Sequence, residues 1–379
     1  MTRALLWTLI WLPLTALAQD DADVLFRADF ENDLCGLTAP SPAARLSITT
    51  DPNFVFAGTG SLQLSFQQPD AGTPDEEAMP GLLTCPLPAP LVDARAISFA
   101  VSSQVPTALA VVVSEGEDGP RYIETIWCEG DQWDEVVVPL AELRADPDGP
   151  EDPNGRLDPD EVSGLVLVDI GRSLGSEPES ALFYREPPAE QTIWLDDLRV
   201  LRSVPPVDRP GMPDNEVLIC DYRAPLRGAI VLGGKDRVMQ YEPSEDGECV
   251  KLTYALPAKT LLAVVHIIPR GLPAGARSIR LEVKAAAETQ LVIAMEEHPL
   301  QPGQESPTYS HLCRIAAGAP WASLDIPLSE FELEGGKTDD DGKLALDRVQ
   351  TVIIADAGAV VDGQAVANTL WLGGLVAVH

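Results

Sequence analysis

Hydrophobic and polar residues alternate over short stretches along most of this chain. Residues 24–31 (VLFRADFE), 61–66 (SLQLSF) and 249–254 (CVKLTY) are clear cases. An alternation with a period of two is typical of β-strands that bury one face. Only two short segments, 140–144 and 159–162, are compatible with helical turns. The pattern therefore predicts a protein built from short strands with almost no helix.

The same pattern is written twice. A strand-like segment that begins WDEVVVPL at Trp133 recurs as WASLDIPL at Trp321, and the closing segment TIWLDDLRV recurs as TLWLGGLVAV near the C-terminus. The preceding segments repeat in the same order. Each half has about eight short strands separated by Gly, Pro and Asp residues, which predicts an all-β chain of two tandem antiparallel β-sandwich domains of the jelly-roll type.

Two segments set the expected domain boundaries. Residues 1–18 combine Arg3, an apolar run and an Ala-Leu-Ala end, which is the pattern of a cleaved signal peptide. Residues 204–214 contain several prolines, which cannot join a sheet interior and form a stiff linker. We therefore expect domains at 19–203 and 215–379, in a secreted or periplasmic protein without a membrane-spanning segment.

The chain is strongly acidic. Its 26 Lys and Arg residues against 59 Asp and Glu residues give a formal net charge of −33, and residues 19–203 contain no lysine. Nucleic acids and anionic membranes bind basic surfaces, so neither is an expected partner. The acidity can serve solubility alone, or it can accompany a neutral ligand or a divalent cation.

The six cysteines are divided three and three between the halves. An exported protein can keep disulfides. Cys35 and Cys85 both lie in loop-like sequence and are the pair that we expect to form a bridge. Cys128 and Cys313 precede the repeated tryptophan on a strand, so they can instead be small buried residues.

Four features together resemble the galactose-binding-like jelly rolls. They are a first strand that ends in DFE, the WDEVVVPL strand, an NGRL loop before a hydrophobic strand, and the closing IWLDDL strand. Within that fold the chain is similar to the carbohydrate-binding modules attached to bacterial polysaccharide-degrading enzymes and to the complex I intermediate-associated proteins. The resemblance covers almost all of the chain after residue 18, twice. It implies a non-catalytic module that binds glycan on one sheet face, often with a structural calcium ion.

In such modules a calcium ion ties the first strand to the last, which points to Glu31, Asp196 and Asp197. In the second copy Arg223 replaces Glu31, and Gly373–Gly374 replace the two aspartates. The three carboxylates are thus lost together, as expected if they share a cation. We therefore expect structural calcium in the first domain only, although three independent surface charges would also fit.

A second acidic loop, residues 146–161, matches part of the EF-hand calcium loop. Pro150 occupies the first ligand position of that loop and has no oxygen-bearing side chain. A plain Asn-Gly turn between strands explains this loop better than a calcium site.

A glycan site needs aromatic rings, because the apolar face of a sugar stacks on a flat ring while its hydroxyls meet carboxylates and amides. Tyr122 and Trp127, with Glu124 and Glu129 beside them, are the predicted ligand-binding set, since the second copy has no aromatic residue at the position of Trp127. Trp133 is included because the alternation of residues along this strand places it on the face that points away from the core. Its recurrence in the second copy equally fits a structural role, as does that of the tryptophan in the closing strand.

The sequence contains no recognisable catalytic constellation. The four histidines lie in the second half without metal-ligand spacing, and no nucleophile elbow or phosphate loop is present. Glu296, Glu297 and His298 form the densest titratable cluster, but adjacent strand residues point to opposite faces. We therefore expect a non-enzymatic glycan-binding protein. The alternative is a structural or protein-interaction module of the cell envelope, and a glycan-cleaving enzyme would need two carboxylates facing each other across a cleft.

Overall fold

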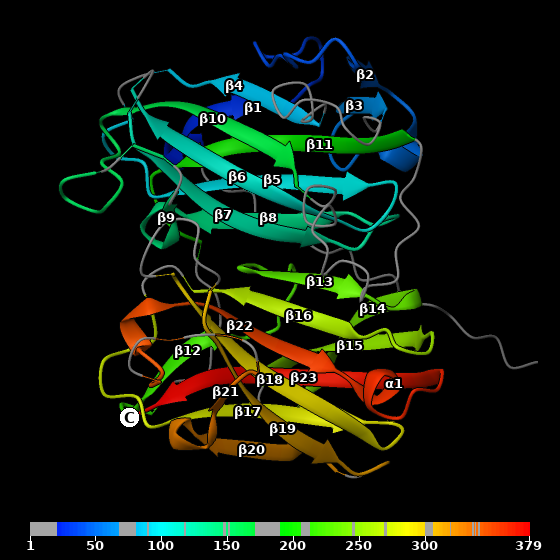
Figure 1. Ribbon diagram of the computed structural model, residues 1–379. Helices are drawn as coiled ribbons and strands as arrows, with labels where there is room; N and C mark the ends of the chain where they lie inside the picture. The colour runs from blue at the N-terminus through cyan, green and yellow to red at the C-terminus, as the bar shows by residue number, and fades with distance from the viewer. Residues whose placement is uncertain are drawn as a thin grey trace, which may run out of the picture.

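The computed structural model consists almost entirely of antiparallel β-sheets (Figure 1). It describes residues 21–67, 81–88, 91–116, 119–146, 149–150, 152–170, 190–205, 213–244, 247–268, 271–299, 306–318, 320–335, 337, 339 and 342–379. Each half of the chain forms a sandwich of two sheets, which confirms the predicted all-β fold of two tandem domains. The expected signal peptide and most of the expected linker lie outside the described residues. Within the described ranges, no helix is both long and apolar enough to cross a membrane.

The first domain contains a six-stranded and a five-stranded sheet. The first sheet has the order β2-β3-β11-β5-β8, with β1 also paired to β11, and the second has the order β4-β10-β6-β7-β9. The strands are β1 (Val24–Ala28), β2 (Ala44–Thr49), β3 (Ser61–Gln67), β4 (Leu82–Pro86), β5 (Ala96–Ser103), β6 (Thr107–Glu115), β7 (Arg121–Cys128), β8 (Asp134–Pro139), β9 (Arg144–Ala145), β10 (Val162–Asp169) and β11 (Glu190–Leu201). Short 3-10 turns occur at η1 (Asp21–Asp23), η2 (Pro52–Phe54) and η4 (Leu140–Glu142).

The second domain repeats this arrangement with two six-stranded sheets. One has the order β14-β15-β23-β17-β20, with β12 also paired to β23, and the other has the order β13-β16-β22-β18-β19-β21. The strands are β12 (Glu216–Cys220), β13 (Ala229–Gly233), β14 (Lys235–Ser244), β15 (Gly247–Leu256), β16 (Leu262–Ile267), β17 (Ser278–Ala285), β18 (Thr289–Glu297), β19 (Thr308–Ile315), β20 (Ala322–Pro327), β21 (Glu332–Leu333), β22 (Val349–Asp356) and β23 (Val366–Val378). The helical pieces are η7 (Leu328–Glu330), η8 (Leu346–Arg348) and the single α-helical turn α1 (Gly358–Val361).

The alternation in the sequence determines which face of each strand enters the core. In β8, Val136 and Val138 are 1% and 0% exposed, whereas Glu135 is exposed to solvent. Each domain also buries a ring directly after its first strand: Phe30 and Tyr222 are both 0% exposed and have positive φ angles of 54° and 52°. The two domains therefore share register and backbone detail as well as strand order.

The two domains are joined edge to edge by hydrogen bonds. The backbone N–H of Trp127 on β7 donates to the carbonyl of Leu226 at 2.9 Å, and the N–H of Gly228 donates to the carbonyl of Thr125 at 2.8 Å. The same Gly228 carbonyl accepts the N–H of Ile267 in the second domain at 2.9 Å. In Figure 1, β7 at the lower side of the upper sandwich and β13 at the top of the lower sandwich accordingly face each other. We call the pairing of β7 with residues 226–228 the seam.

Candidate functional site

The structure contradicts most of the predicted ligand-binding set, because three of its residues are buried. Tyr122, Glu124 and Trp127 are 1%, 5% and 4% exposed, so a ligand on the surface cannot reach them. Tyr122 packs in the first core and donates its hydroxyl hydrogen bond to Asp152. Burial raises the pKa of Glu124, although the guanidinium of Arg144, at 3.2 Å, opposes this effect.

Trp127 is an interdomain residue. Its ring packs with the core of the second domain, and the guanidinium carbon of Arg237 lies 4.8 Å from the ring centroid. The indole N–H donates to Glu129 Oε2 at 2.8 Å, and Glu129 Oε1 accepts the backbone N–H of Met239 at 2.9 Å. The equivalent residue on β19 is Arg314, whose side chain is 77% exposed. The tryptophan does not recur because β7 meets the other domain, whereas the Arg314 side chain on β19 is open to solvent, so its uniqueness reflects domain packing.

Trp133 is the member of the predicted set that remains at an open surface. It lies on the outer face of the β2-β3-β11-β5-β8 sheet with three further aromatic residues. The ring of Phe56 is 38% exposed and lies 5.7 Å from that of Trp133, at an interplanar angle of 50°. Phe54 stacks on the buried Trp194 at 4.2 Å and 5°. We call these four residues the aromatic face.

Polar groups border the aromatic face. Trp194 pairs in register with Gln63 on β3 and Ser102 on β5, and the exposed Glu135 follows Trp133 on the same side of β8. The indole N–H of Trp194 is buried and has no hydrogen-bond partner among the described residues. A buried donor without an acceptor costs free energy, and the same burial keeps a surface ligand away from this N–H group.

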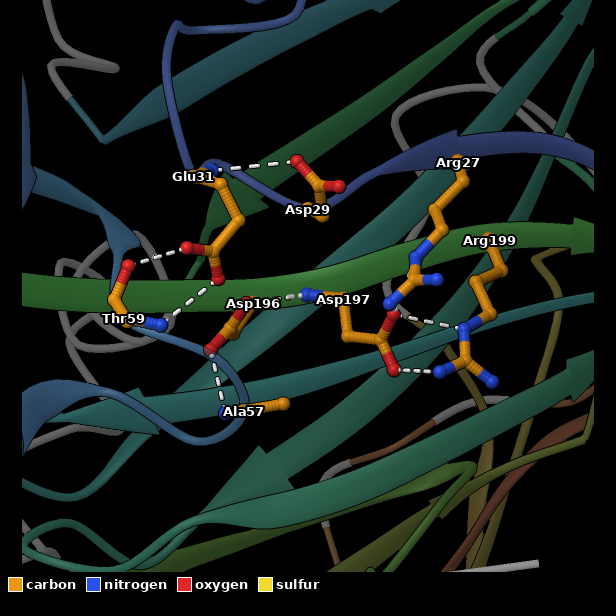
Figure 2. Close-up of polar contacts among 8 residues, drawn as sticks. All are labelled: Arg27, Asp29, Glu31, Ala57, Thr59, Asp196, Asp197 and Arg199. Carbon is orange, nitrogen blue, oxygen red and sulfur yellow. Dashed lines mark hydrogen bonds and ion pairs between the residues drawn. The ribbon is translucent and has the colours of Figure 1, made fainter. Parts of the chain in front are cut away.

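Carboxylates from the first and last strands hold the loop that carries Phe54 and Phe56 (Figure 2). Glu31 accepts hydrogen bonds from the backbone N–H of Thr59 at 2.9 Å and from its hydroxyl at 2.5 Å. Asp196 accepts the backbone N–H groups of Phe56 and Ala57 at 3.0 and 2.9 Å. The bonds from Thr59 lower the pKa of Glu31, whereas burial raises the pKa of Asp196 against the opposing backbone bonds.

Asp197 points away from these two carboxylates, toward Arg27 at 3.1 Å and toward Arg199 (Figure 2). Among the described residues, no group of three or more His, Cys, Asp and Glu side chains is arranged to hold a metal ion. Glu31, Asp196 and Asp197 thus each have a protein partner and do not converge on one point. The geometry does not favour them as a shared calcium site, and calcium stays a prediction.

The second domain lacks the loop that these carboxylates hold. Residues 50–60 separate β2 from β3, whereas β14 ends at Ser244 and β15 begins at Gly247. Arg223 and Gly373 occupy the positions of the two loop-holding carboxylates. The second domain therefore lacks both carboxylates because it lacks the loop that they bind, and no shared cation is needed to explain their absence.

The acidic loop within residues 146–161 folds on its own hydrogen bonds where the structure describes it. Asp152 accepts the backbone N–H of Arg156 at 2.8 Å, and Glu115 Oε1 accepts that of Asp158 at 2.5 Å. These contacts are those of a turn tied to a neighbouring strand.

The titratable cluster near Glu297 is also structural. Glu297 is 0% exposed, and its Oε2 lies 2.6 Å from a guanidinium nitrogen of Arg348. His266 is buried with Nε2 2.8 Å from the Tyr222 hydroxyl, and burial together with the charge of Arg144 lowers its pKa to about 3. Glu297 and His266 are thus both closed to a substrate, whereas His298 of the predicted cluster is exposed and Glu296 is partly exposed.

All six cysteines are free thiols in the structure, so the predicted Cys35–Cys85 disulfide is not formed. The two residues lie on neighbouring segments, because Thr38 and Thr84 exchange backbone hydrogen bonds of 3.0 and 2.9 Å. Burial is the main reason why the pKa of the Cys85 thiol is raised to about 12, and it also raises that of Cys35. A bridge between them stays a prediction for oxidising conditions.

Sequence reasoning missed Phe54 and Phe56, the aromatic residues that complete the face. Both lie in a segment that has no counterpart in the second copy, the sequence PNFVF between β2 and β3. Two aromatic residues in such an insertion are the signal that could have identified them. The same reasoning predicted Trp127 as a ligand-binding residue. It failed there because a residue present in only one copy can contact either a ligand or the other domain.

Comparison with known proteins gives distant structural likenesses only. No family model matches the chain, and no curated protein matches it. A family 11 carbohydrate-binding module from Clostridium thermocellum, solved in complex with a β-1,3-1,4-mixed-linked tetrasaccharide, is 13% identical with a TM-score of 0.33, over 45% of this chain and 93% of that one. An N-terminal tandem of two family 22 modules from Paenibacillus barcinonensis is 11% identical with a TM-score of 0.29, over 94% of this chain and 98% of that one.

An exo-β-agarase is 16% identical with a TM-score of 0.32, over 48% of this chain and 25% of that one. These comparisons give no support for a resemblance to the complex I intermediate-associated proteins. Likenesses at this distance do not assign a ligand, so a functional argument must come from the geometry of this chain.

Proposed function

We propose that this protein is a secreted or periplasmic glycan-binding module that binds neutral carbohydrate, without acting on it, through the aromatic face of the first domain. The observation that supports the proposal is the pair of surface rings, Phe56 and Trp133, within the aromatic face. Two rings set at an angle can follow the faces of successive sugar units in a chain, which are themselves twisted relative to one another.

The neighbouring groups suit a neutral sugar. The exposed carboxylate of Glu135 and the partly exposed amide of Gln63 can hydrogen-bond hydroxyl groups. Residues 19–203 contain no lysine and an excess of acidic residues, so the domain as a whole disfavours an anionic glycan. Rings fix the position of the sugar, and polar groups select among hydroxyl patterns.

The loop that presents Phe56 is held in place before any ligand arrives. The carboxylates of Glu31 and Asp196 bind its backbone N–H groups, and the hydroxyl of Ser61 donates to the carbonyl of Phe54. A preformed face loses less conformational entropy on binding than a mobile one, so these bonds favour affinity.

The test is binding of the purified full chain, beside Phe56→Ala and Trp133→Ala, to a panel of neutral polysaccharides and oligosaccharides by affinity electrophoresis and calorimetry. We expect each substitution to weaken binding at least tenfold, which corresponds to about 1.4 kcal/mol. Trp321→Ala, at the equivalent position of the second domain, is the matched control and should bind as the wild type does.

Failure of every neutral glycan to bind, or wild-type affinity in both variants, would show that the proposal is wrong. That result would favour the alternative function, a structural or protein-interaction module of the cell envelope. Repeating the binding and thermal unfolding measurements with a chelator tests the calcium prediction separately: lower affinity or a lower Tm on chelation supports it, and unchanged values oppose it.

A further inference from the structure

The outer face of the β14-β15-β23-β17-β20 sheet repeats the aromatic face with different neighbours. Trp371 on β23 pairs in register with Lys251 on β15 and with Lys284 on β17. Their Nζ atoms lie 5.8 and 4.7 Å from the Trp371 ring centroid. All three side chains are partly exposed. We call these three residues the lysine face.

The two lysines differ in how their charges are compensated. Lys251 Nζ lies 2.8 Å from Glu242 Oε1, and Glu242 Oε2 accepts the indole N–H of Trp371 at 3.0 Å. Bonds from Lys251 and Trp371 lower the pKa of Glu242, so it remains charged. Lys284 forms no close ion pair with any described residue and lies over the ring, although its charge also lowers the pKa of Glu242. The lysine face therefore carries two ammonium groups beside the single carboxylate of Glu242.

Two lysines around one surface ring are unexpected in a chain with 59 acidic and 26 basic residues. The equivalent positions in the first domain, Gln63 and Ser102, flank Trp194 with neutral side chains. Because the register is the same in both domains, these two positions can be compared directly, and in the second domain they carry longer, positively charged side chains. Positive charge on both sides of a surface ring suits a ligand that combines a sugar ring with a negative group.

We propose that the lysine face is a second saccharide site, which takes a sugar that carries a carboxylate or sulfate group. This inference rests on the proposed function, because it extends glycan binding from the aromatic face to the equivalent face of the second domain. The anionic group is bound by the ammonium groups of Lys284 and Lys251, and the sugar ring lies against the indole of Trp371.

The contact between Lys284 and the ring does not block this site. A cation–π contact at a partly exposed position is weaker than a charge-assisted hydrogen bond to a carboxylate or sulfate oxygen. The long lysine side chain can therefore turn from the ring to an anionic ligand and leave the indole face to the sugar. Because the site is near the surface, binding must weaken as ionic strength rises.

The experiment measures binding of the full chain to three probes by calorimetry at low and moderate salt. They are an oligogalacturonate, which carries carboxylates, a sulfated galactan oligosaccharide, and a neutral oligosaccharide that binds the wild type at the aromatic face. The variants are Lys251→Gln and Lys284→Gln, with Lys259→Gln, an exposed lysine in the turn before β16, as the matched control for charge.

We expect at least one anionic probe to bind, with affinity that falls tenfold or more in Lys284→Gln and less in Lys251→Gln, while Lys259→Gln behaves as the wild type. The probe that binds distinguishes carboxylate from sulfate recognition. Absence of binding by both anionic probes, or equal affinity in all variants, overturns the inference. The neutral oligosaccharide tests the proposed function separately. If Trp133→Ala abolishes its binding and Lys284→Gln does not, the proposed function holds even when the inference about the lysine face fails.

Discussion

The outer faces of the two equivalent sheets have the same tryptophans in the same register and yet offer different chemistry. In the first domain Trp194 has a phenylalanine stacked on it and neutral residues on both sides. In the second domain Trp371 has lysines on both sides and donates its N–H to Glu242. The two domains thus place a tryptophan at the same position of the sheet. The residues on neighbouring strands and loops determine which ligand groups the tryptophan can contact.

The loop between the first two strands of this sheet is the other difference. Residues 50–60 place Phe54 and Phe56 over the face of the first domain, and no such segment separates β14 from β15. Glu31 and Asp196 occur only where that loop exists, because they accept hydrogen bonds from its backbone. The presence of these two carboxylates in the first domain only is therefore explained by the loop backbone that they bind.

The largest expected effect concerns Trp127 and its counterpart Arg314. Trp127→Ala removes a buried ring from between the domains, and we expect the free energy of unfolding to fall by about 3–5 kcal/mol. Arg314→Ala alters an exposed side chain, and we expect a change within about 0.5 kcal/mol. Chemical denaturation of both variants measures this difference. Equal effects would contradict the assignment of Trp127 to the interdomain core.

A smaller effect should separate Asp134 from its counterpart Ala322. Burial, with the nearby charge of Glu129, raises the pKa of Asp134 to about 7. The folded state thus favours the neutral carboxyl, so stability is greatest below the ordinary aspartate pKa of about 4 and falls as the pH rises to about 7. Asp134→Asn should remove this loss, raising the free energy of unfolding by about 2–4 kcal/mol at pH 8 and leaving it unchanged at pH 4.

Unfolding curves recorded between pH 4 and pH 8 test this expectation. A variant that is destabilised equally at both ends would show that the charge of Asp134 does not limit stability at high pH. Such a result would also contradict the unfavourable pairing with Glu129 near the seam.

The smallest expected effect is a partial conversion of one face into the other. Gln63→Lys places in the first domain the positive charge that Lys251 supplies in the second. We expect a gain of about fivefold in affinity for oligogalacturonate, or about 1 kcal/mol, measured in a background that contains Lys284→Gln. A lysine introduced at Arg45, exposed on the neighbouring strand β2 and already positive, is the matched control. No gain in Gln63→Lys would show that the charge beside the ring is not sufficient.

Several features could be predicted from residues alone because they depend on local alternation. In β8, alternate residues point to opposite faces: Val136 and Val138 point into the core and Glu135 points outward. The same alternation predicts that Trp133 points outward. The repeated strand segments predicted two sandwiches, since each alternating segment must bury its apolar side against a second sheet.

The sequence by itself determined the strands, their facing and the duplication, because a period of two in hydrophobicity is a local property of the chain. Only the tertiary structure decided that Trp127 lies in an interdomain core, that Glu31 and Asp196 bind a loop, and that Lys251 and Lys284 flank one ring. These outcomes depend on which distant segments become neighbours. That choice is made by packing and by register between strands, which local alternation leaves undetermined.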